Sequence, residues 1–280
     1  MDLKDKHIII TGVSKGIGLE LSKILVEKGC NVYGWGRNAP EWTHERFRFV
    51  KADIQNEGAV NYAAAQTLEM SNGRVDGLVN NAGLGYFGYL EKQPMDEIDA
   101  MVKTNIMGVI YATRSVLGVM KGQQSGHIIN ISSVGGLVGQ PFNEVYCAAK
   151  FAVEGLTESL ASYVTPGFGV RFTSIQPGGI TSEFANSILK QVEATGGLLE
   201  DDYLPLLQRY IGTARARMGG DAYQSSAEAA AVVLACLEQE DPPLRLRTSD
   251  WAEQFCTLKT AADPDGLKQQ AATIEVTLGL

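Results

Sequence analysis

The stretch TGVSKGIG, residues 11–18, separates a short apolar run at residues 7–11 from an amphipathic segment that ends at Gly29. The run predicts a strand, and apolar residues at helical spacing predict that a helix follows, with Gly29 in the position that often closes one. Glycines in such a turn let the backbone approach a ligand closely, and the free N–H groups of a helix N-terminus attract the charge of a pyrophosphate. The glycine spacing is G-x-x-x-G-x-G instead of G-x-G-x-x-G, so the stretch alone fits either a dinucleotide site or an ordinary turn.

The same order of short β-branched runs and helix-length segments repeats along the chain. Helices are expected near 57 to 70, 95 to 121, 146 to 164 and 226 to 239. Alternation of this kind is typical of β-α-β units, so we predict an α/β fold with a Rossmann-type, doubly wound parallel sheet of about seven strands and helices on both faces. The predicted strands are His7 to Thr11, Asn31 to Trp35, Phe47 to Ala52, Gly77 to Asn80, His127 to Ser132, Val170 to Gln176 and Leu244 to Arg247.

No internal repeat, proline-rich linker or block of charge divides the 280 residues. This predicts a single dinucleotide-binding and catalytic domain over residues 1–280. An irregular excursion from about residue 181 to 225 carries proline, glycine pairs and scattered aromatic residues. Long excursions in a compact domain commonly form a lid or a substrate loop. We expect a C-terminal extension from about residue 249.

Composition and charge exclude several classes of protein. Hydrophobic residues make up 45% of the chain and charged residues 20%, which excludes a disordered or fibrous protein. The net charge of −8 disfavours binding to nucleic acid or to an anionic membrane surface. The longest apolar run, residues 229–236, is far too short to span a bilayer, and the charges near the N-terminus argue against a signal peptide.

The four cysteines lie far apart and form no C-x-x-C pair. Their spacing is typical of neither a zinc site nor a disulfide framework, so no metal is expected. Unpaired thiols of this kind are typical of a reducing compartment, which favours a cytoplasmic protein. The cysteines are Cys30, Cys147, Cys236 and Cys256.

Further motifs follow the glycine-rich turn in a fixed order along the chain. They are N-N-A-G at residues 80–83, Asn105 in the next predicted helix, Ser133 after the fifth predicted strand, Tyr146 and Lys150 as Y-x-x-x-K, and Pro177-Gly178 after the sixth strand. In order and spacing this set resembles the short-chain dehydrogenase/reductase family, and the resemblance covers about residues 5 to 250. The tail from Pro242 is more loosely similar to the branch that contains 17-beta-hydroxysteroid and retinol dehydrogenases.

Tyr146 and Lys150 are four residues apart, so on a helix their side chains share one face. A free tyrosine has a pKa near 10, too high for proton exchange at neutral pH. An ammonium at about 5 Å, with an effective dielectric constant of about 20, contributes roughly 3 kcal/mol and lowers that pKa by about two units. The spacing therefore predicts a tyrosine that works as a general acid and base.

The family resemblance implies a role for each catalytic candidate. Tyr146 would give its proton to a carbonyl oxygen while a hydride arrives from a nicotinamide, and Ser133 would hydrogen-bond that oxygen. Lys150 would also hold the nicotinamide ribose, and Asn105 would anchor a water molecule in the proton relay. The chain would then be an enzyme that interconverts a carbonyl and an alcohol on a small molecule.

The resemblance also implies the contacts with the cofactor. Asp53 would meet the adenine amino group, although an acid at this position could also cap the following helix. After the sixth strand a hydroxyl from Thr181 or Ser182 would face the nicotinamide amide, and the alignment favours Ser182. The expected contacts are Gly12, Ser14, Lys15, Gly16, Ile17, Gly18, Arg37, Asp53, Ile54, Asn81, Ala82, Gly83, Tyr146, Lys150, Pro177, Gly178, Ile180 and Ser182.

The end of the second predicted strand bears on the choice of cofactor. NAD enzymes generally carry an acid here for the ribose hydroxyls, whereas NADP enzymes carry basic residues for the 2′-phosphate. This chain has Gly36 followed by Arg37, whose guanidinium can grip a phosphate with two hydrogen bonds, and Lys15 adds a second cation. We therefore predict NADP(H), the alternative being that both cations are solvated surface charges.

Aromatic residues near the predicted nicotinamide site suggest a mostly apolar substrate pocket, although they could equally form the core of a lid. They are Tyr86, Phe87, Phe142, Phe184, Tyr203 and Tyr210. Three arginines, Arg209, Arg215 and Arg217, could instead meet an acidic substrate such as a 3-oxoacyl thioester, or lie on a solvated face.

Two questions concern the molecule as a whole. Ser133, Tyr146 and Lys150 are all present, which favours an enzyme over a non-catalytic NADP(H)-binding sensor or scaffold. Family members usually pack the helices near 95 to 121 and 146 to 164 against symmetry mates, so a homodimer or homotetramer is expected. We expect neither a nucleic-acid partner nor a membrane span.

Overall fold

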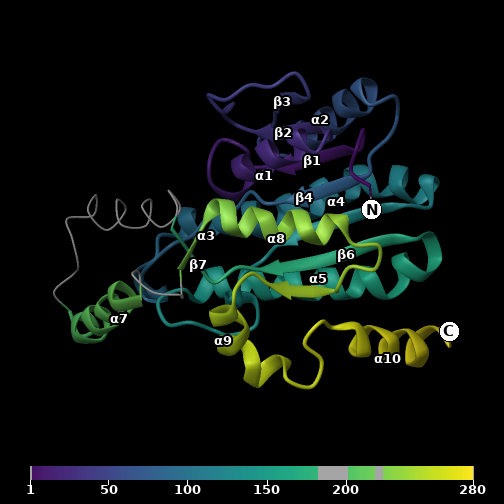
Figure 1. Cartoon of the computed structure of the whole chain (residues 1–280). Helices are drawn as coiled ribbons and strands as arrows, with labels where there is room; N and C mark the ends of the chain where they lie inside the picture. Colours follow the sequence, from purple (N-terminus) through teal and green to yellow (C-terminus); the bar gives the residue numbers. More distant parts are fainter. Residues whose placement is uncertain (1, 182–200, 218–222, 280) are drawn as a thin grey trace.

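Seven parallel strands form one sheet in the computed structural model, which describes residues 2–181, 201–217 and 223–279 (Figure 1). Along the sheet the order is β3-β2-β1-β4-β5-β6-β9, so the chain winds outward in both directions from the β1–β4 pair. This doubly wound order confirms the predicted Rossmann-type fold and every predicted strand. The strands are β1 (His7–Thr11), β2 (Asn31–Gly36), β3 (Phe47–Lys51), β4 (Gly77–Asn80), β5 (Gly126–Ile131), β6 (Val170–Gln176) and β9 (Arg245–Arg247).

Helices cover both faces of this sheet (Figure 1). One face carries α1 (Gly16–Glu27) and α8 (Ser226–Glu238), which pack against each other. The other face carries α2 (Glu57–Met70), α4 (Gly108–Gln123) and α5 (Glu144–Phe168). The predicted helices near 57 to 70, 146 to 164 and 226 to 239 are confirmed, with ends that differ by a few residues at most.

Successive residues of β1 point to opposite faces of the sheet, and the last four of its five residues are buried. Ile8 and Ile10 belong to the core beneath α1 and α8, whereas Ile9 belongs to the core beneath α2 and α4. A strand that is buried on both faces needs apolar residues at every position. This is why residues 8–10 form a continuous apolar run instead of an alternating one.

The helix expected near 95 to 121 contains a π-helical turn. The turn, η2 (Lys103–Met107), joins α3 (Met95–Val102) to α4 and contains Asn105. Single π turns of this kind lie mostly inside α-helices and often at functional sites. Periodicity in the sequence predicts the helix but not the extra residue in this turn.

The excursion expected to be irregular contains regular structure in its described part. β7 (Gly179–Thr181) and β8 (Tyr223–Ser225) form a small parallel sheet, and α7 (Leu204–Arg217) lies between them in sequence. Leu207 and Tyr210 of α7, together with Tyr203 just before the helix, pack against Tyr89 and Phe142. Because a few large rings hold this helix instead of a long apolar stripe, the sequence pattern does not indicate it.

The C-terminal extension forms two helices, α9 (Asp250–Thr260) and α10 (Leu267–Leu278). α9 packs on η3 (Val134–Gly136), the short helix after β5. α10 lies beside α5 (Figure 1), where the Gln270 amide donates to the Ala161 carbonyl oxygen at 3.1 Å.

The four cysteines are free and buried. Within residues 2–181, 201–217 and 223–279, no group of side chains is arranged to hold a metal ion. In the same ranges no helix is both long and apolar enough to cross a membrane.

Candidate active site

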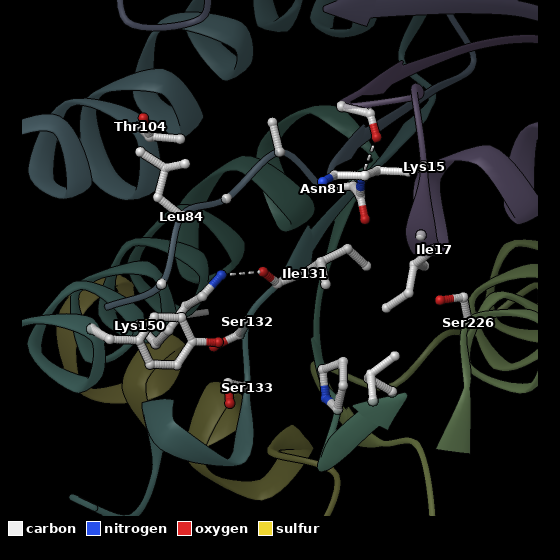
Figure 2. Close-up of a pocket in the computed structure, with 18 of the residues that line it drawn as sticks. Lys15, Ile17, Asn81, Leu84, Thr104, Ile131, Ser132, Ser133, Lys150 and Ser226 are labelled. Atoms are coloured by element: carbon white, nitrogen blue, oxygen red, sulfur yellow. Dashed lines mark hydrogen bonds between the residues drawn. The ribbon is translucent and has the colours of Figure 1, made fainter. Parts of the chain in front are cut away.

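Most of the predicted site residues line one cavity of about 850 Å³ at the carboxyl ends of the strands (Figure 2). The cavity crosses the sheet between β1 and β4, where the strand order reverses and where sheets of this type bind ligands. Gly18 and Asn105 do not line it, and Ser182 lies outside the described residues. The predicted residues that do are Gly12, Ser14, Lys15, Gly16, Ile17, Arg37, Asp53, Ile54, Asn81, Ala82, Gly83, Ser133, Tyr146, Lys150, Pro177, Gly178 and Ile180.

Close approach of the backbone requires two glycines of the turn. Gly12 has a φ of +76°, and a Cβ there would come within 2.8 Å of the Ala82 Cα atom. A Cβ on Gly18 would come within 2.3 Å of the Gly12 carbonyl oxygen. Gly18 therefore lets α1 pack against the turn, while Gly12 lets the turn pack against the loop after β4.

Thr11 and Asn81 hold the glycine-rich turn in place. The Thr11 hydroxyl accepts hydrogen bonds from the N–H groups of Asn81 and Ala82, each at 3.0 Å. The Asn81 amide donates to the carbonyl oxygens of Thr11 and Gly12, each at 2.9 Å. Sequence analysis does not single out Thr11, whose only signal is a hydroxyl at the last position of a strand.

Lys15 and Arg37 line the cavity near the N-terminus of α1. Lys15 is the N-cap residue of α1, and its side chain makes no capping hydrogen bond. The helix N-terminus and the two cations suit pyrophosphate and phosphate groups. The backbone at Gly36 tolerates a side chain, since a Cβ there would make only ordinary contacts at 3.7 Å. These residues fit a dinucleotide cofactor.

Asp53 lies on the wall of the cavity and does not cap α2. The N-cap residue is Asn56, whose side chain accepts from the Ala59 N–H at 2.9 Å. Asp53 accepts from the Gln55 N–H at 3.0 Å, which fixes the start of this loop. The capping alternative for Asp53 is therefore wrong, and its contact with adenine stays a prediction.

Ser133, Tyr146 and Lys150 converge at the other end of the cavity. Ser133 accepts from the Gly135 N–H at 3.0 Å and hydrogen-bonds the Tyr146 side chain. Lys150 lies one turn after Tyr146 on α5, with its Nζ atom 5.6 Å from the centroid of the tyrosine ring. Its ammonium donates to the Ile131 carbonyl oxygen at 2.8 Å (Figure 2). Three of the four predicted catalytic side chains are thus brought together by α5 and the segment that follows β5.

Burial dominates the ionisation of Tyr146 and Lys150. It raises the pKa of Tyr146 to about 12, against the lowering effect of the Ser133 hydrogen bond. It lowers the pKa of Lys150 to about 8, against the raising effect of the Glu154 carboxylate. The predicted lowering of the tyrosine pKa is therefore contradicted, because exclusion of water from the phenolate raises the pKa by more than the Ser133 hydrogen bond lowers it. Tyr146 is a protonated donor at neutral pH.

The Asn105 side chain holds the loop after β4 through two hydrogen bonds with its backbone. The Leu84 N–H donates to Asn105 Oδ1 at 2.8 Å, and Asn105 Nδ2 donates to the Leu84 carbonyl oxygen at 2.8 Å. Leu84 in turn lines the cavity. The role of Asn105 as the anchor of a relay water stays a prediction.

Beyond Tyr146 the cavity reaches side chains that sequence analysis does not single out. Gln140 and Asn143 come from the segment before α5, and Trp251 and Phe255 come from α9. The two rings of α9 stack with their centroids 4.9 Å apart. Their only signal in the sequence is a pair of aromatic residues at helical spacing in the tail.

Of the predicted aromatic residues, Tyr210 lines the cavity. Phe87, Phe142 and Tyr203 pack with it in the cluster beneath α7, so the lid-core alternative holds for them. Phe184 and the side chains at 215 and 217 lie outside the described part of the chain, and Arg209 is exposed on α7.

This fold and this cavity point to the enzymes that transfer a hydride and bind a nicotinamide dinucleotide across the switch point of a doubly wound sheet. Within that class, the family profile described as short chain dehydrogenase matches residues 6–193. The chain belongs to this family and is an oxidoreductase.

Named relatives extend over almost the whole chain. A 3-ketodihydrosphingosine reductase from Bacteroides thetaiotaomicron is 32% identical over 97% of this chain and 98% of its own. The human 17-beta-hydroxysteroid dehydrogenase type 1 is 33% identical over 87% of this chain and 77% of its own. The expected likeness to the steroid and retinol dehydrogenase branch is confirmed.

Solved structures agree with the fold. A short-chain dehydrogenase from Streptomyces avermitilis superimposes with a TM-score of 0.76 at 28% identity, covering 98% of this chain and 99% of the other. Structures with this fold hold NADP in some cases and NADH in others. The preference for one cofactor therefore has to be argued from the residues of this chain.

Proposed function

We propose that the protein is an NADP(H)-dependent reductase that converts a ketone on a mostly apolar substrate into an alcohol. The convergence of Ser133, Tyr146 and Lys150 carries this proposal, because they meet in the cavity that also borders the rings of Trp251 and Phe255. A carbonyl placed there has two hydroxyl donors beside its oxygen and aromatic surface beside its carbon chain.

The side chains divide the work of the reduction. Bound NADPH supplies the hydride. Tyr146, protonated at neutral pH, donates its proton to the carbonyl oxygen, and Ser133 donates a hydrogen bond to the same oxygen. The Lys150 ammonium, beside the tyrosine ring, stabilises the phenolate that remains.

The preference for NADP(H) rests on Arg37, Lys15 and the missing acid at Gly36. Arg37→Asp removes a charge-assisted hydrogen bond, worth about 1.5–3 kcal/mol, and adds repulsion against the 2′-phosphate. NADPH affinity should fall at least about tenfold, whereas NADH should bind no worse. Dissociation constants of both cofactors, measured for wild type and variant, check this. Equal losses for the two cofactors would reject the preference.

Gly36→Asp provides a complementary test. A side chain fits at this position, because a Cβ would meet nothing closer than 3.7 Å. The new carboxylate should weaken NADPH binding and offer an acceptor to the ribose hydroxyls of NADH. Gly36→Ala is the matched control, since it adds the Cβ without the charge and should leave both dissociation constants unchanged.

The substrate class is tested with a panel of carbonyl compounds. It contains 3-ketodihydrosphingosine, a 17-ketosteroid and retinal, chosen from the names of the relatives, together with a short polar ketone and a 3-oxoacyl thioester. NADPH consumption should be fastest with the apolar members. Preference for the thioester would favour the alternative of a 3-oxoacyl thioester reductase, in which Arg209 meets the acidic carrier. Turnover of none would favour a sensor or scaffold.

A further inference from the structure

Glu154 is a buried carboxylate on the catalytic face of α5 that the proposed reaction does not use. It lies one turn after Lys150, as Lys150 lies one turn after Tyr146, so the three side chains share one face of the helix. Only 5% of Glu154 is exposed. An acid buried this deeply in a helix is costly unless the surrounding groups satisfy it.

Donors from β6 satisfy the Glu154 carboxylate. The Ser174 hydroxyl donates to it at 2.6 Å, and the Gln176 amide donates to it at 2.9 Å. Gly136 leaves room for this arrangement, because a Cβ there would come within 3.1 Å of Glu154 Oε1 and 2.6 Å of the Ser132 hydroxyl. The carboxylate therefore sits among the segments that precede Ser133 and Pro177 in the wall of the cavity.

Few charged or titratable side chains lie near Glu154. From α5 they are Lys150 and Glu158, from β9 Arg247, whose guanidinium lies 3.4 Å from Gln176 Oε1, and from α9 the buried thiol of Cys256. Burial raises the pKa of Glu154, and the hydroxyls and the amide around it lower it. The carboxylate in turn raises the pKa of Lys150 against the effect of burial.

We propose that Glu154 is a positioning residue whose carboxylate, one turn from Lys150 on the same buried face of α5, balances the Lys150 ammonium and holds Gln176, next to the cofactor-facing Pro177, in register with α5. The inference rests on the proposed function, because the charge of Lys150 matters only if Tyr146 gives up a proton beside it. Loss of the Glu154 charge should let Lys150 become neutral at a lower pH. As the pH rises, reduction and NADPH binding should then begin to weaken at a lower pH than in the wild type.

The test compares pH profiles of kcat/KM for ketone reduction and of the NADPH dissociation constant. In the wild type both should worsen above about pH 8, where Lys150 loses its proton. In Glu154→Gln, which keeps the shape of the side chain, the decline should begin about one to two pH units lower, as expected for the loss of one charge between helix neighbours four residues apart, whose Cβ atoms generally lie about 5–6 Å from each other. Glu154→Asp keeps the charge and should keep the wild-type profile.

Glu158→Gln is the matched control, because it removes the same charge from the next turn of α5, where the side chain is 40% exposed. Its profiles should follow the wild type. If the Glu154→Gln profiles superimpose on the wild type while only its melting temperature falls, Glu154 is merely structural and the inference is overturned. If the wild type reduces no ketone, the proposed function has failed, and the NADPH binding profile still decides the role of Glu154.

Discussion

Tyr146 and Lys150 show how burial prepares two ordinary side chains for proton transfer. Burial holds the tyrosine in its protonated form, with a pKa of about 12, and brings the lysine to a pKa of about 8. A protonated phenol beside a cation is poised to donate to a carbonyl oxygen. At the scale of single residues, the proposed reduction therefore has its proton donor in place at neutral pH.

His127 gives the fold a dependence on pH that is separate from catalysis. Its ring is buried on β5, where Nε2 lies 2.9 Å from the Thr173 hydroxyl, and burial lowers its pKa to about 3. The unfolded chain binds a proton near pH 6.5, so acid favours the unfolded state. Between about pH 6.5 and 4 the free energy of unfolding should lose about 1.4 kcal/mol per pH unit from this group.

The contribution of His127 is checked by measuring the free energy of unfolding in denaturant for wild type, His127→Gln and His44→Gln across this pH range. His44 is exposed, so its variant controls for the same chemical substitution at a surface position. His127→Gln should show a shallower dependence, whatever its stability at neutral pH. Identical slopes for wild type and His127→Gln would contradict the account.

Residue patterns predicted the catalytic side chains because these lie at fixed spacings, such as Tyr146 and Lys150 on one helical face. Glu154 shares that face, but a glutamate inside a long helix is usually a solvated surface residue. Its burial depends on packing against the sheet, which the sequence pattern does not show. Trp251 reaches the cavity through the packing of α9, a contact between segments far apart in sequence. The balance of burial and charge at Tyr146 also needs the three-dimensional surroundings.

The strand–turn–helix unit is the element on which the cofactor site depends. Gly18→Ala should displace α1 from the turn, because a Cβ would come within 2.3 Å of the Gly12 carbonyl oxygen. We expect NADPH affinity to fall by at least about tenfold and the melting temperature to drop.

Gly118→Ala is the control for the glycine turn. Gly118 lies on α4 with nothing within 4 Å of its Cβ position, so alanine should stabilise the protein by about 0.5–1 kcal/mol. Its NADPH affinity should equal that of the wild type. A Gly18→Ala variant that binds NADPH as tightly would show that the close approach is not required.

Elements with strong periodicity were predictable, and those held by a few tertiary contacts were not. The strands buried on both faces contain unbroken apolar runs such as residues 8–10, so the number of strands in the main sheet and their positions along the chain could be predicted. α7 depends on ring contacts of Tyr203 and Tyr210 with loops far away in sequence. The π turn at Asn105 adds one residue to a helix without changing its apolar pattern enough to reveal it.

At the scale of the whole molecule, Arg247 ties the C-terminal extension to the sheet. It pairs with both oxygens of Glu253 on α9, at 2.6 and 2.9 Å, and donates to the Pro264 carbonyl oxygen at 2.7 Å. This brings α9 and its aromatic pair to the end of the cavity. We propose that residues 1–280 act as one domain, in which the extension completes the wall beside the substrate.

The exposed apolar side chains of α3 and α5 suit an interface between copies of the chain. Val102, Phe151 and Tyr163 are 37%, 42% and 50% exposed. Light scattering should give a mass of at least twice the 30.2 kDa of one chain. Phe151→Arg should lower the mass, whereas Leu258→Arg on α9, at a fully exposed position, should not. A wild-type mass near that of one chain at micromolar concentration would contradict the prediction.

Transfer of deuterium from the nicotinamide C4 position of labelled NADPH to the product alcohol tests the central claim most directly. Mass spectrometry of the product formed from the best ketone of the panel should find one deuterium on the carbinol carbon with the wild type. Tyr146→Phe should bind NADPH with nearly unchanged affinity and form product at least about a hundredfold more slowly, because it lacks the proton donor. If the wild type binds NADPH but transfers no label, or if Tyr146→Phe stays within about tenfold of the wild-type rate, the proposed chemistry is wrong.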